Sequence, residues 1–339
     1  MKAIRIREPG DPDVLELVER GDLEPGPGEA LVRVRAAGLN RADLLQRRGL
    51  YPAPAGSPPD IPGLEFAGEL VAVGPDAGRP GEARARRALK IGAHVMGICG
   101  GGGYAEQVVV PVEHLMLTPP GLDPVASGAI PEVFLTACDA LFTRGRLEQG
   151  ERVLIHSAGG GVGTAAVQLA RLAGAVGVAG TASAPKLERL DERGLPLDLA
   201  IDYRLGGFAE AVREWTAGRG IDVIIDTVGA PYFAENVASL APLGRIVLVG
   251  VMGGSRTEVD LRALMAKRAT VVGTVLRARS IEQKAEATRR FAERFLAAFA
   301  RRPPGLEPMV DRTFVLSDAA EAHRYLESNR AFGKVILEV

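Results

Sequence analysis

An apolar segment that breaks into glycines and then resumes as helix-like sequence constrains this chain more than any other feature. Residues 153–156 are typical of a buried strand, and an Ala-, Val- and Leu-rich segment follows the glycines. A glycine in the middle of such a loop lets the backbone approach phosphates, and a later one lets the helix pack closely on the strand. The N–H groups of the helix N-terminus favour negative charge. The spacing predicts dinucleotide binding at Gly160, Gly161, Val162 and Gly163, with Ala158 where the strict fingerprint has its first glycine.

Composition excludes several classes of protein. With 339 residues, 47% of them hydrophobic, the chain can bury a core, and its length suggests about two domains. A formal net charge of −1 argues against a general attraction to nucleic acid or to an anionic membrane. No apolar run approaches the ~20 residues of a membrane span, and residues 1–6 are typical of a strand and not of a signal peptide. We therefore expect a cytoplasmic protein.

The pattern of predicted secondary structure changes near residue 126. Before it, short alternating segments such as 30–35 and 107–110 are interrupted by Pro and Gly, which predicts a strand-rich domain. After it, apolar strands alternate with Ala-rich helices, which predicts a doubly wound parallel sheet and the α/β class. Strand-like sequence returns at 312–315 and 334–339, and we expect this tail to complete the first domain.

The segment after the second predicted strand indicates which nucleotide binds. In an NAD-specific site an acidic residue ends that strand and binds the ribose 2′-hydroxyl. Here Ala182 stands near that point, and Lys186 follows in the first turn of the next helix, where an ammonium can meet a 2′-phosphate. Tyr203 and Arg204, after the third strand, are further candidates for holding that phosphate. These residues favour NADP(H) over NAD(H).

Several further blocks, in order along the chain, carry a family resemblance. They are Gly-Leu-Asn-Arg-Ala-Asp-Leu at 38–44, Gln-Arg-Arg-Gly-Leu-Tyr at 46–51, Ile-Pro-Gly-Leu-Glu at 61–65, Ile-Pro-Glu-Val-Phe-Leu-Thr-Ala at 130–137, and Gly-Lys-Val at 333–335. With the glycine loop, the chain resembles the zinc-independent quinone oxidoreductase branch of the medium-chain dehydrogenase/reductase superfamily, which includes zeta-crystallin. It looks most like the stress-inducible NADPH:quinone oxidoreductase subgroup. The resemblance implies a GroES-like domain at 1–125, completed by 300–339, and a Rossmann domain at 126–299.

The same superfamily contains zinc alcohol dehydrogenases, and the ligand positions separate the branches. The zinc branch places a Cys at or beside Asn40 and a His in the block that reads Gly63-Leu64-Glu65 here. Neither ligand is present, and the four closely spaced cysteines of a structural zinc site cannot come from Cys99 and Cys138 alone. The sequence therefore predicts no metal site.

Without a Lewis acid, hydride delivery to an electron-poor acceptor is easier than alcohol oxidation. The resemblance implies NADPH bound between the domains and a quinone or conjugated enone as acceptor, with donors near the acceptor oxygen. It makes Asn40 and Tyr51 the candidate catalytic residues, and the proton comes from Tyr51 or from water. Asp43 is expected to orient the Asn40 segment, and a structural alternative for Tyr51 is a loop residue that covers the cofactor.

Other cofactor contacts follow from position in the family. The remaining predicted cofactor contacts are Thr136, Val228, Gly250, Val251, Met252, Gly253, Leu276, Arg277, Phe332 and Lys334.

The resemblance also implies a homodimer, formed by pairing of sheet edges near residues 270–274.

Two other functions remain open from sequence. An NADPH-dependent enone, alkenal or enoyl-thioester reductase uses the same hydride donor, and the arginine-rich insertion at 79–90 suits a basic entrance for a long acyl carrier. Otherwise that insertion is expected to be a solvated loop. A protein that binds the nucleotide without turnover is the third possibility, but the near-neutral charge and 5% aromatic content argue against an RNA-binding role.

Overall fold

The computed structural model describes residues 1–79, 81–300 and 305–339, apart from the side chains of residues 86 and 88. Contacts divide the chain into two compact units, which are here called unit 1 (Met1–Leu135 with Leu276–Val339) and unit 2 (Thr136–Val275). Over the described ranges, no helix combines the length and the apolar character needed to cross a bilayer.

Unit 2 is built on a six-stranded parallel sheet in the order β10-β9-β8-β11-β12-β13. The chain starts in the middle at β8, winds outward to β10, and returns to the other side of β8 at β11. Its elements are β8 (Arg152–His156), α5 (Gly161–Leu172), β9 (Gly177–Ala182), α6 (Ala184–Glu192), β10 (Leu199–Asp202), α7 (Ala209–Trp215), β11 (Ile221–Asp226), α8 (Phe233–Ser239), β12 (Leu240–Leu248), α9 (Leu261–Lys267) and β13 (Thr270–Gly273).

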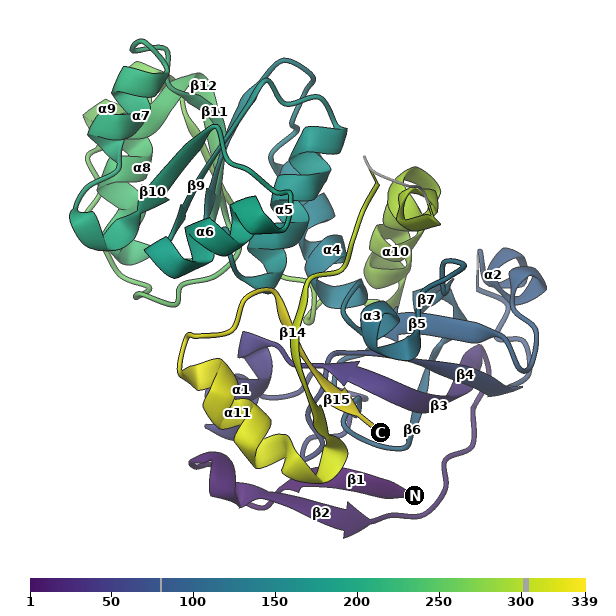
Figure 1. The fold of residues 1–339 in the computed structure, drawn as a ribbon. Coiled ribbons are helices and arrows are strands. Elements are labelled where there is room, and N and C mark those ends of the chain that lie inside the picture. The colour runs from purple at the N-terminus through teal and green to yellow at the C-terminus, as the bar shows by residue number, and fades with distance from the viewer. Residues whose placement is uncertain (80, 301–304) are drawn as a thin grey trace. The chain divides into compact units, whose positions relative to one another are not determined.

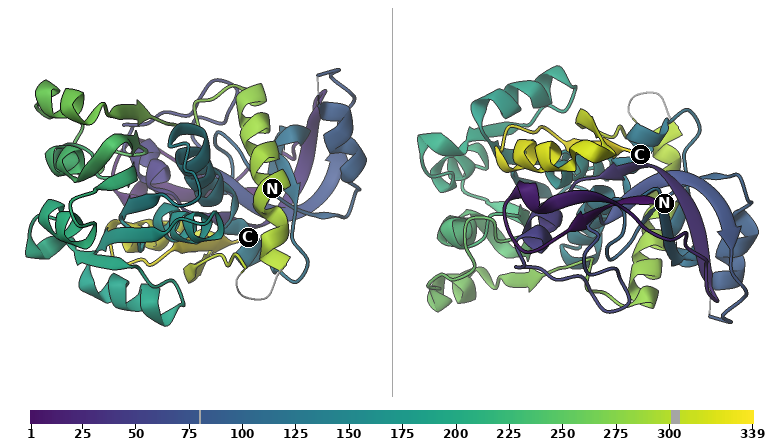
Figure 2. Two further views of the ribbon diagram at one scale, coloured as in Figure 1. Left: turned by 90° about the horizontal axis from the view of Figure 1, so that it is seen from above. Right: turned by 90° about the horizontal axis from the view of Figure 1, so that it is seen from below.

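Helices cover both faces of this sheet, as Figures 1 and 2 show. The helices α5 and α6 pack on β8, β9 and β10, while α7, α8 and α9 contact one another and form the other layer. The central strands are buried on both faces, so their sequences are apolar without alternation. This is the doubly wound α/β sheet that the sequence predicted, and ligands bind such sheets at the carboxyl ends of the strands, where the strand order reverses.

Unit 1 contains a seven-stranded sheet in the order β14-β15-β3-β4-β5-β7, with β6 also paired to β3, and a separate β1–β2 hairpin. It is the GroES-like domain that the sequence predicted. Its elements are β1 (Lys2–Ile6), β2 (Leu15–Glu19), β3 (Glu29–Gly38), α1 (Arg41–Arg47), β4 (Glu65–Val73), α2 (Glu82–Ala88), β5 (His94–Ile98), β6 (Gln107–Pro111), β7 (Leu115–Leu117), α3 (Pro124–Gly128), α4 (Pro131–Cys138, which crosses into unit 2), α10 (Ile281–Phe295), β14 (Val310–Val315), α11 (Ala319–Glu327) and β15 (Lys334–Glu338).

Strand register in unit 1 brings distant residues together at one end of β3. Antiparallel pairing sets Ile336 of β15 opposite Gly38, so the register places Lys334 opposite Asn40, two residues beyond the end of β3. On the other side of β3, Ala37 pairs with Phe66, which places Glu65 beside Gly38. Figure 1 shows the C-terminal strand β15, drawn in yellow, lying along β3, drawn in purple.

Two features differ from expectation. The helix α10, expected in the nucleotide domain, belongs to unit 1, because Phe291 packs on Phe134 and Phe299 and the backbone carbonyl of Ile281 contacts the ring of His114. The arginine-rich insertion at 79–90 is not a loop throughout, since α2 forms within it; Glu82, buried in the first turn of α2, accepts backbone N–H groups from Ala77 and Arg79. Pro80 of this insertion and residues 301–304 of the expected 300–339 segment lie outside the described residues.

Candidate functional site

The glycine loop of unit 2 connects the end of β8 to the start of α5. Ser157 adopts a φ of 55°, in the left-handed region, and turns the chain so that its carbonyl accepts the N–H of Gly160 at 2.8 Å. Gly160 is the N-cap of α5, and no side chain caps this helix end. The first N–H groups of any α-helix lack intrahelical partners. Because no side chain caps α5, its first N–H groups remain available to an anion.

The two fingerprint glycines, Gly160 and Gly163, are glycine for different reasons. A Cβ on Gly163 would lie 2.2 Å from the backbone oxygen of Ser157 and 2.6 Å from Cα of Ala158, so a side chain cannot fit between the helix and the loop. A Cβ on Gly160 would meet only the oxygen of Ser157, at 3.3 Å, and the φ of −89° suits any residue. The fold thus requires Gly163, whereas a Cβ on Gly160 would need the oxygen of Ser157 to shift by only a few tenths of an ångström.

Lys186 lies beside this loop. It is in the first turn of α6, and a Cβ placed on Gly159 would come within 2.8 Å of Cβ of Lys186, so its side chain packs on the loop. Ala182 ends β9 and is buried, and no carboxylate occupies that position. Tyr203 is 49% exposed at the end of β10, whereas the guanidinium of Arg204 is paired with Asp202 at 2.9 Å.

The remaining predicted contacts of unit 2 surround the carboxyl ends of β11 and β12. Buried Asp226 shapes the first of these loops by accepting the N–H groups of Val228 and Gly229 at 2.7 and 2.9 Å. The loop at 250–253 is joined to it by backbone hydrogen bonds, including one from Gly253 to Val228. The hydroxyl of Thr227 donates to Ser157, which connects β11 to the glycine loop across the point of strand reversal.

In unit 1, Lys334 is the centre of a buried polar cluster around Asn40. The ammonium, on a residue only 3% exposed, donates to the carbonyl of Leu39 at 2.5 Å and to Oδ1 of Asn40 at 2.8 Å, and it pairs with Glu65 at 2.6 Å. These contacts occupy the three donors of an ammonium. The amide of Asn40 in turn donates to Glu65 at 2.9 Å and to the carbonyl of Gly38 at 3.3 Å. Lys334 and Asn40, predicted for cofactor and substrate respectively, thus contact each other.

Asp43 holds the backbone next to this cluster in place. Its carboxylate accepts the N–H groups of Asn40 and Gly63 and the hydroxyl of Tyr104, at 2.8, 3.0 and 3.1 Å. Complete burial raises the pKa of Asp43 to about 6, although the two N–H donors act in the opposite direction. The prediction that Asp43 orients the Asn40 segment is confirmed.

Tyr51 lies in the segment between α1 and β4, which contains no helix or strand, and Arg277 contacts it. The guanidinium carbon of Arg277 is 5.1 Å from the centre of the Tyr51 ring, and Nη1 donates to the Tyr51 carbonyl at 3.0 Å. Within the part of the chain that the structure describes, no group hydrogen-bonds to the hydroxyl of Tyr51. Of the two predicted catalytic residues, Tyr51 therefore has the freer donor.

Glu132 was given no role from the sequence, yet its electrostatic environment is unusual. Its backbone N–H donates to Glu65 at 2.8 Å, and burial together with the negative charge of Glu65 raises the pKa of the Glu132 carboxyl to about 8. At neutral pH this carboxyl is therefore largely protonated. The proline before it and the start of α4 were visible in the sequence, but the proximity of Glu65 requires the fold.

The other predicted residues have less distinctive surroundings. Thr136 lies partly buried in α4, at the start of unit 2, while Leu276 and Phe332 are buried in unit 1. His156 of β8 is fully buried and hydrogen-bonded to Thr181 and Asn236.

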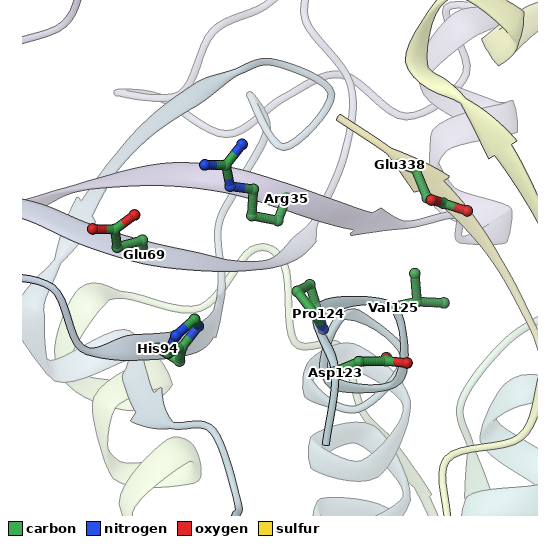
Figure 3. Close-up of a pocket in the computed structure, with 7 residues that line it drawn as sticks. All are labelled: Arg35, Glu69, His94, Asp123, Pro124, Val125 and Glu338. Atoms are coloured by element: carbon green, nitrogen blue, oxygen red, sulfur yellow. The ribbon is translucent and has the colours of Figure 1, made fainter. Parts of the chain in front are cut away.

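A cavity of about 360 Å³ lies in unit 1, away from these residues. Figure 3 shows the side chains that line it. It lies between β3, β4 and the N-terminal end of α3, and its charged residues carry both signs. None of its lining residues was predicted as a site residue, and mixed exposed charges of this kind do not select one ligand. The lining residues are Arg35, Glu69, His94, Asp123, Pro124, Val125 and Glu338.

Comparisons with known proteins agree with this arrangement. Residues 26–120 match the alcohol dehydrogenase GroES-like domain, and residues 161–293 match the zinc-binding dehydrogenase family. The chain is 34% identical over 337 residues to a quinone oxidoreductase of Pseudomonas aeruginosa, with 99% of each chain covered. It is 32% identical over 331 residues to the synaptic vesicle membrane protein VAT-1 homolog of Rattus norvegicus, covering 92% of this chain and 77% of that protein.

Two solved structures extend the comparison. The mycobacterial protein Rv1454c complexed with NADPH superposes with a TM-score of 0.82 at 27% identity, covering all of both chains. The JamJ enoyl reductase in its apo form superposes with a TM-score of 0.84 at 27% identity, covering 99% of this chain and 98% of that one.

Both domain types occur in the expected order, and full-length relatives exceed 30% identity. This chain therefore belongs to the medium-chain dehydrogenase/reductase superfamily of oxidoreductases, in the group of the quinone oxidoreductases and VAT-1 homologs.

Proposed function

We propose that this chain is an NADPH-dependent, zinc-independent quinone oxidoreductase. The observation that carries the cofactor assignment is the glycine loop, where Gly160 leaves space that the fold itself does not use and Lys186 packs alongside. An uncapped helix N-terminus faces the pyrophosphate, and Lys186 meets the 2′-phosphate. The relative from Pseudomonas aeruginosa supplies the quinone as the acceptor class.

The zinc implied by the second family model does not fit the residues present. Among the residues that the structure describes, no group of three or more His, Cys, Asp or Glu side chains is arranged to hold a metal ion. Glu65 is paired with the ammonium of Lys334, which excludes a second cation from that oxygen. Burial raises the pKa of the Cys99 thiol to about 12, and this thiol donates to the carbonyl of Gly63 at 3.2 Å.

The bound nicotinamide supplies the hydride, and residues of this chain orient and protonate the acceptor. Negative charge develops on a carbonyl oxygen of the acceptor, and Tyr51 donates its hydroxyl to that oxygen. Asn40 lies beside the acceptor, and its side chain is held in place by hydrogen bonds with Lys334 and Glu65. The protonated carboxyl of Glu132 is a second proton source within unit 1.

An NADPH-dependent enone, alkenal or enoyl-thioester reductase is the alternative, and the similarity to the JamJ enoyl reductase favours it. Both reactions place charge on a carbonyl oxygen, so the same donors serve either. Steady-state oxidation of NADPH and NADH by the metal-free protein, against parallel panels of quinones and of enones and alkenals, separates the two. Turnover of quinones with NADPH supports the proposal. Turnover of enones or alkenals alone supports the alternative function. Tight NADPH binding without turnover of any acceptor contradicts both proposed activities.

Replacing Lys186 with glutamate should weaken NADPH binding by about tenfold or more, or roughly 1.4 kcal/mol, because a carboxylate then faces the 2′-phosphate. NADH, which lacks that phosphate, should bind as before. Fluorescence titration with each nucleotide measures both values. Arg193→Glu, at the other end of α6, makes the same charge change as a control. If the affinities for NADPH and NADH fell equally, Lys186 would not bind the 2′-phosphate.

We propose a homodimer that forms through the edge of the unit 2 sheet. The strand β13 is hydrogen-bonded on one side only, to β12, and α9 next to it buries none of its residues. Apolar side chains around this edge are exposed, with Met265 at 74% and Val271 at 37%.

Val271→Lys should convert the dimer to a monomer, because edge pairing brings the two lysines near each other and removes apolar contact area. Light scattering coupled to size exclusion, at micromolar concentration, measures the mass. Val176→Lys alters another exposed valine of unit 2, which directly precedes β9 and is separated from β13 by three strands of the sheet, and should leave the mass unchanged. A dimer that survives Val271→Lys would place the interface elsewhere.

A further inference from the structure

Arg277 is almost completely buried, and each of its hydrogen bonds reaches the same part of unit 1. The residue is 3% exposed. Its Nε donates to the carbonyl of Gly100 at 2.8 Å, Nη1 to the carbonyl of Tyr51 at 3.0 Å, and Nη2 to Oε1 of Gln46 at 2.5 Å. The planar guanidinium donates to these three acceptors while its face stays free for an aromatic ring, an arrangement that the compact ammonium of a lysine does not provide.

These contacts fix the segment 48–64, which joins α1 to β4 without helix or strand. Gln46 extends the connection, because its Nε2 donates to the carbonyl of Pro59 at 3.1 Å. Gly100 extends it on the other side, where a Cβ would lie 2.1 Å from the hydroxyl of Ser57. The guanidinium thus contacts the segment directly at Tyr51, and its partners Gln46 and Gly100 contact it at Pro59 and Ser57.

The guanidinium also lies over the ring of Tyr51 and acts on its phenol. A cation within about 6 Å of an aromatic face is attracted to it, and here the distance is 5.1 Å. Burial raises the pKa of Tyr51, the charge of Arg277 lowers it, and the carboxyl of Glu132 raises it. The position and the acidity of the Tyr51 hydroxyl both depend on Arg277.

We propose that Arg277 is the positioning residue for Tyr51 and not a ligand of the cofactor phosphates. The inference rests on the proposed role of Tyr51 in reducing the acceptor. Arg277 holds the Tyr51 backbone at its carbonyl, keeps the ring on the guanidinium face, and favours release of the phenolic proton. It therefore affects the chemical step through Tyr51, and nucleotide affinity does not depend on it.

The experiment is a double-mutant cycle of Arg277→Met and Tyr51→Phe. Tyr51→Phe should lower kcat at least about 10²-fold, as expected for loss of a proton donor. Arg277→Met should lower kcat at least tenfold while the Kd for NADPH stays within twofold, and it should have little further effect when Tyr51 is already phenylalanine. Arg277→Lys, which keeps the charge, should recover part of kcat. Arg48→Met, a surface arginine at the end of α1, serves as the control.

A spectroscopic measurement tests the inference without any substrate. Incorporation of 3-fluorotyrosine labels the five tyrosines, and Tyr51→Phe assigns the resonance of Tyr51 in ¹⁹F NMR. Arg277→Met should move its titration to higher pH, because the neighbouring cation is lost while the carboxyl of Glu132 remains. Arg48→Met should not move it.

Different outcomes contradict different statements. A Kd for NADPH that rises with Arg277→Met, additive losses in the cycle, or an unchanged Tyr51 titration would each overturn the positioning role. A wild-type protein that reduces no quinone and no enone contradicts the proposed function instead. In that case the NMR titration still decides whether Arg277 controls the phenol.

Discussion

Lys334→Met should lower the free energy of unfolding by about 3–5 kcal/mol, the range expected when one partner of a buried ion pair is removed. The carboxylate of Glu65 is fully buried and would lose its counter-charge, while Asn40 and the carbonyl of Leu39 would lose a donor. Denaturant unfolding followed by circular dichroism measures the change.

Two variants make this prediction specific. Lys267→Met removes a single bond from an ammonium to the carbonyl of Leu240, with no carboxylate involved, and should cost about 0.5–1.5 kcal/mol. The double variant Lys334→Met with Glu65→Gln should be more stable than Lys334→Met alone, because no unpaired charge remains buried. If Lys334→Met costs no more than Lys267→Met, the pair with Glu65 does not stabilise unit 1.

Gly160→Ala should weaken NADPH binding by about 1–3 kcal/mol, the usual cost of inserting a methyl group into a filled space, or roughly five- to 150-fold in Kd. The added carbon occupies the space left for the pyrophosphate, yet it meets the protein only at the oxygen of Ser157, 3.3 Å away. The melting temperature without nucleotide should therefore change little.

Gly163→Ala gives the contrasting result. Its Cβ would lie 2.2 Å from the same oxygen, so the loop must move and the protein without nucleotide should also lose stability. Thermal unfolding with and without NADPH, together with fluorescence titration, separates the two variants. If Gly160→Ala bound NADPH as tightly as the wild type, the phosphates would not approach the loop at that residue.

The nucleotide unit was predictable because its signals are local. A strand, a glycine loop and a helix follow one another within twenty residues or so at 152–172, and parallel topology then fixes where the loop lies. The position of Lys186 beside this loop was also predictable, since the helix after the second strand starts at the same edge of the sheet, whereas its role toward a phosphate stays a prediction.

The cluster in unit 1 was not predictable in the same way. Asn40 and Lys334 were both identified, but the sequence suggested separate ligands for them, and only the register of β15 on β3 shows that they bind each other. Arg277 was assigned to the cofactor by position in the family, whereas its buried contacts with Tyr51 and Gln46 join residues that are 226 and 231 positions apart in the chain. No repeating pattern in a sequence indicates which distant polar residues will contact each other.

The pairing of β15 with β3 also determines when the polar cluster of unit 1 is completed during synthesis. Lys334 follows Asn40 by 294 residues, and the whole of unit 2 lies between them. A growing chain on the ribosome can therefore complete the nucleotide-binding unit while Asn40 and Glu65 still lack their ammonium partner. The charge of Glu65 is balanced by Lys334 of β15, so a nascent chain can complete unit 2 before the cluster around Asn40 is formed.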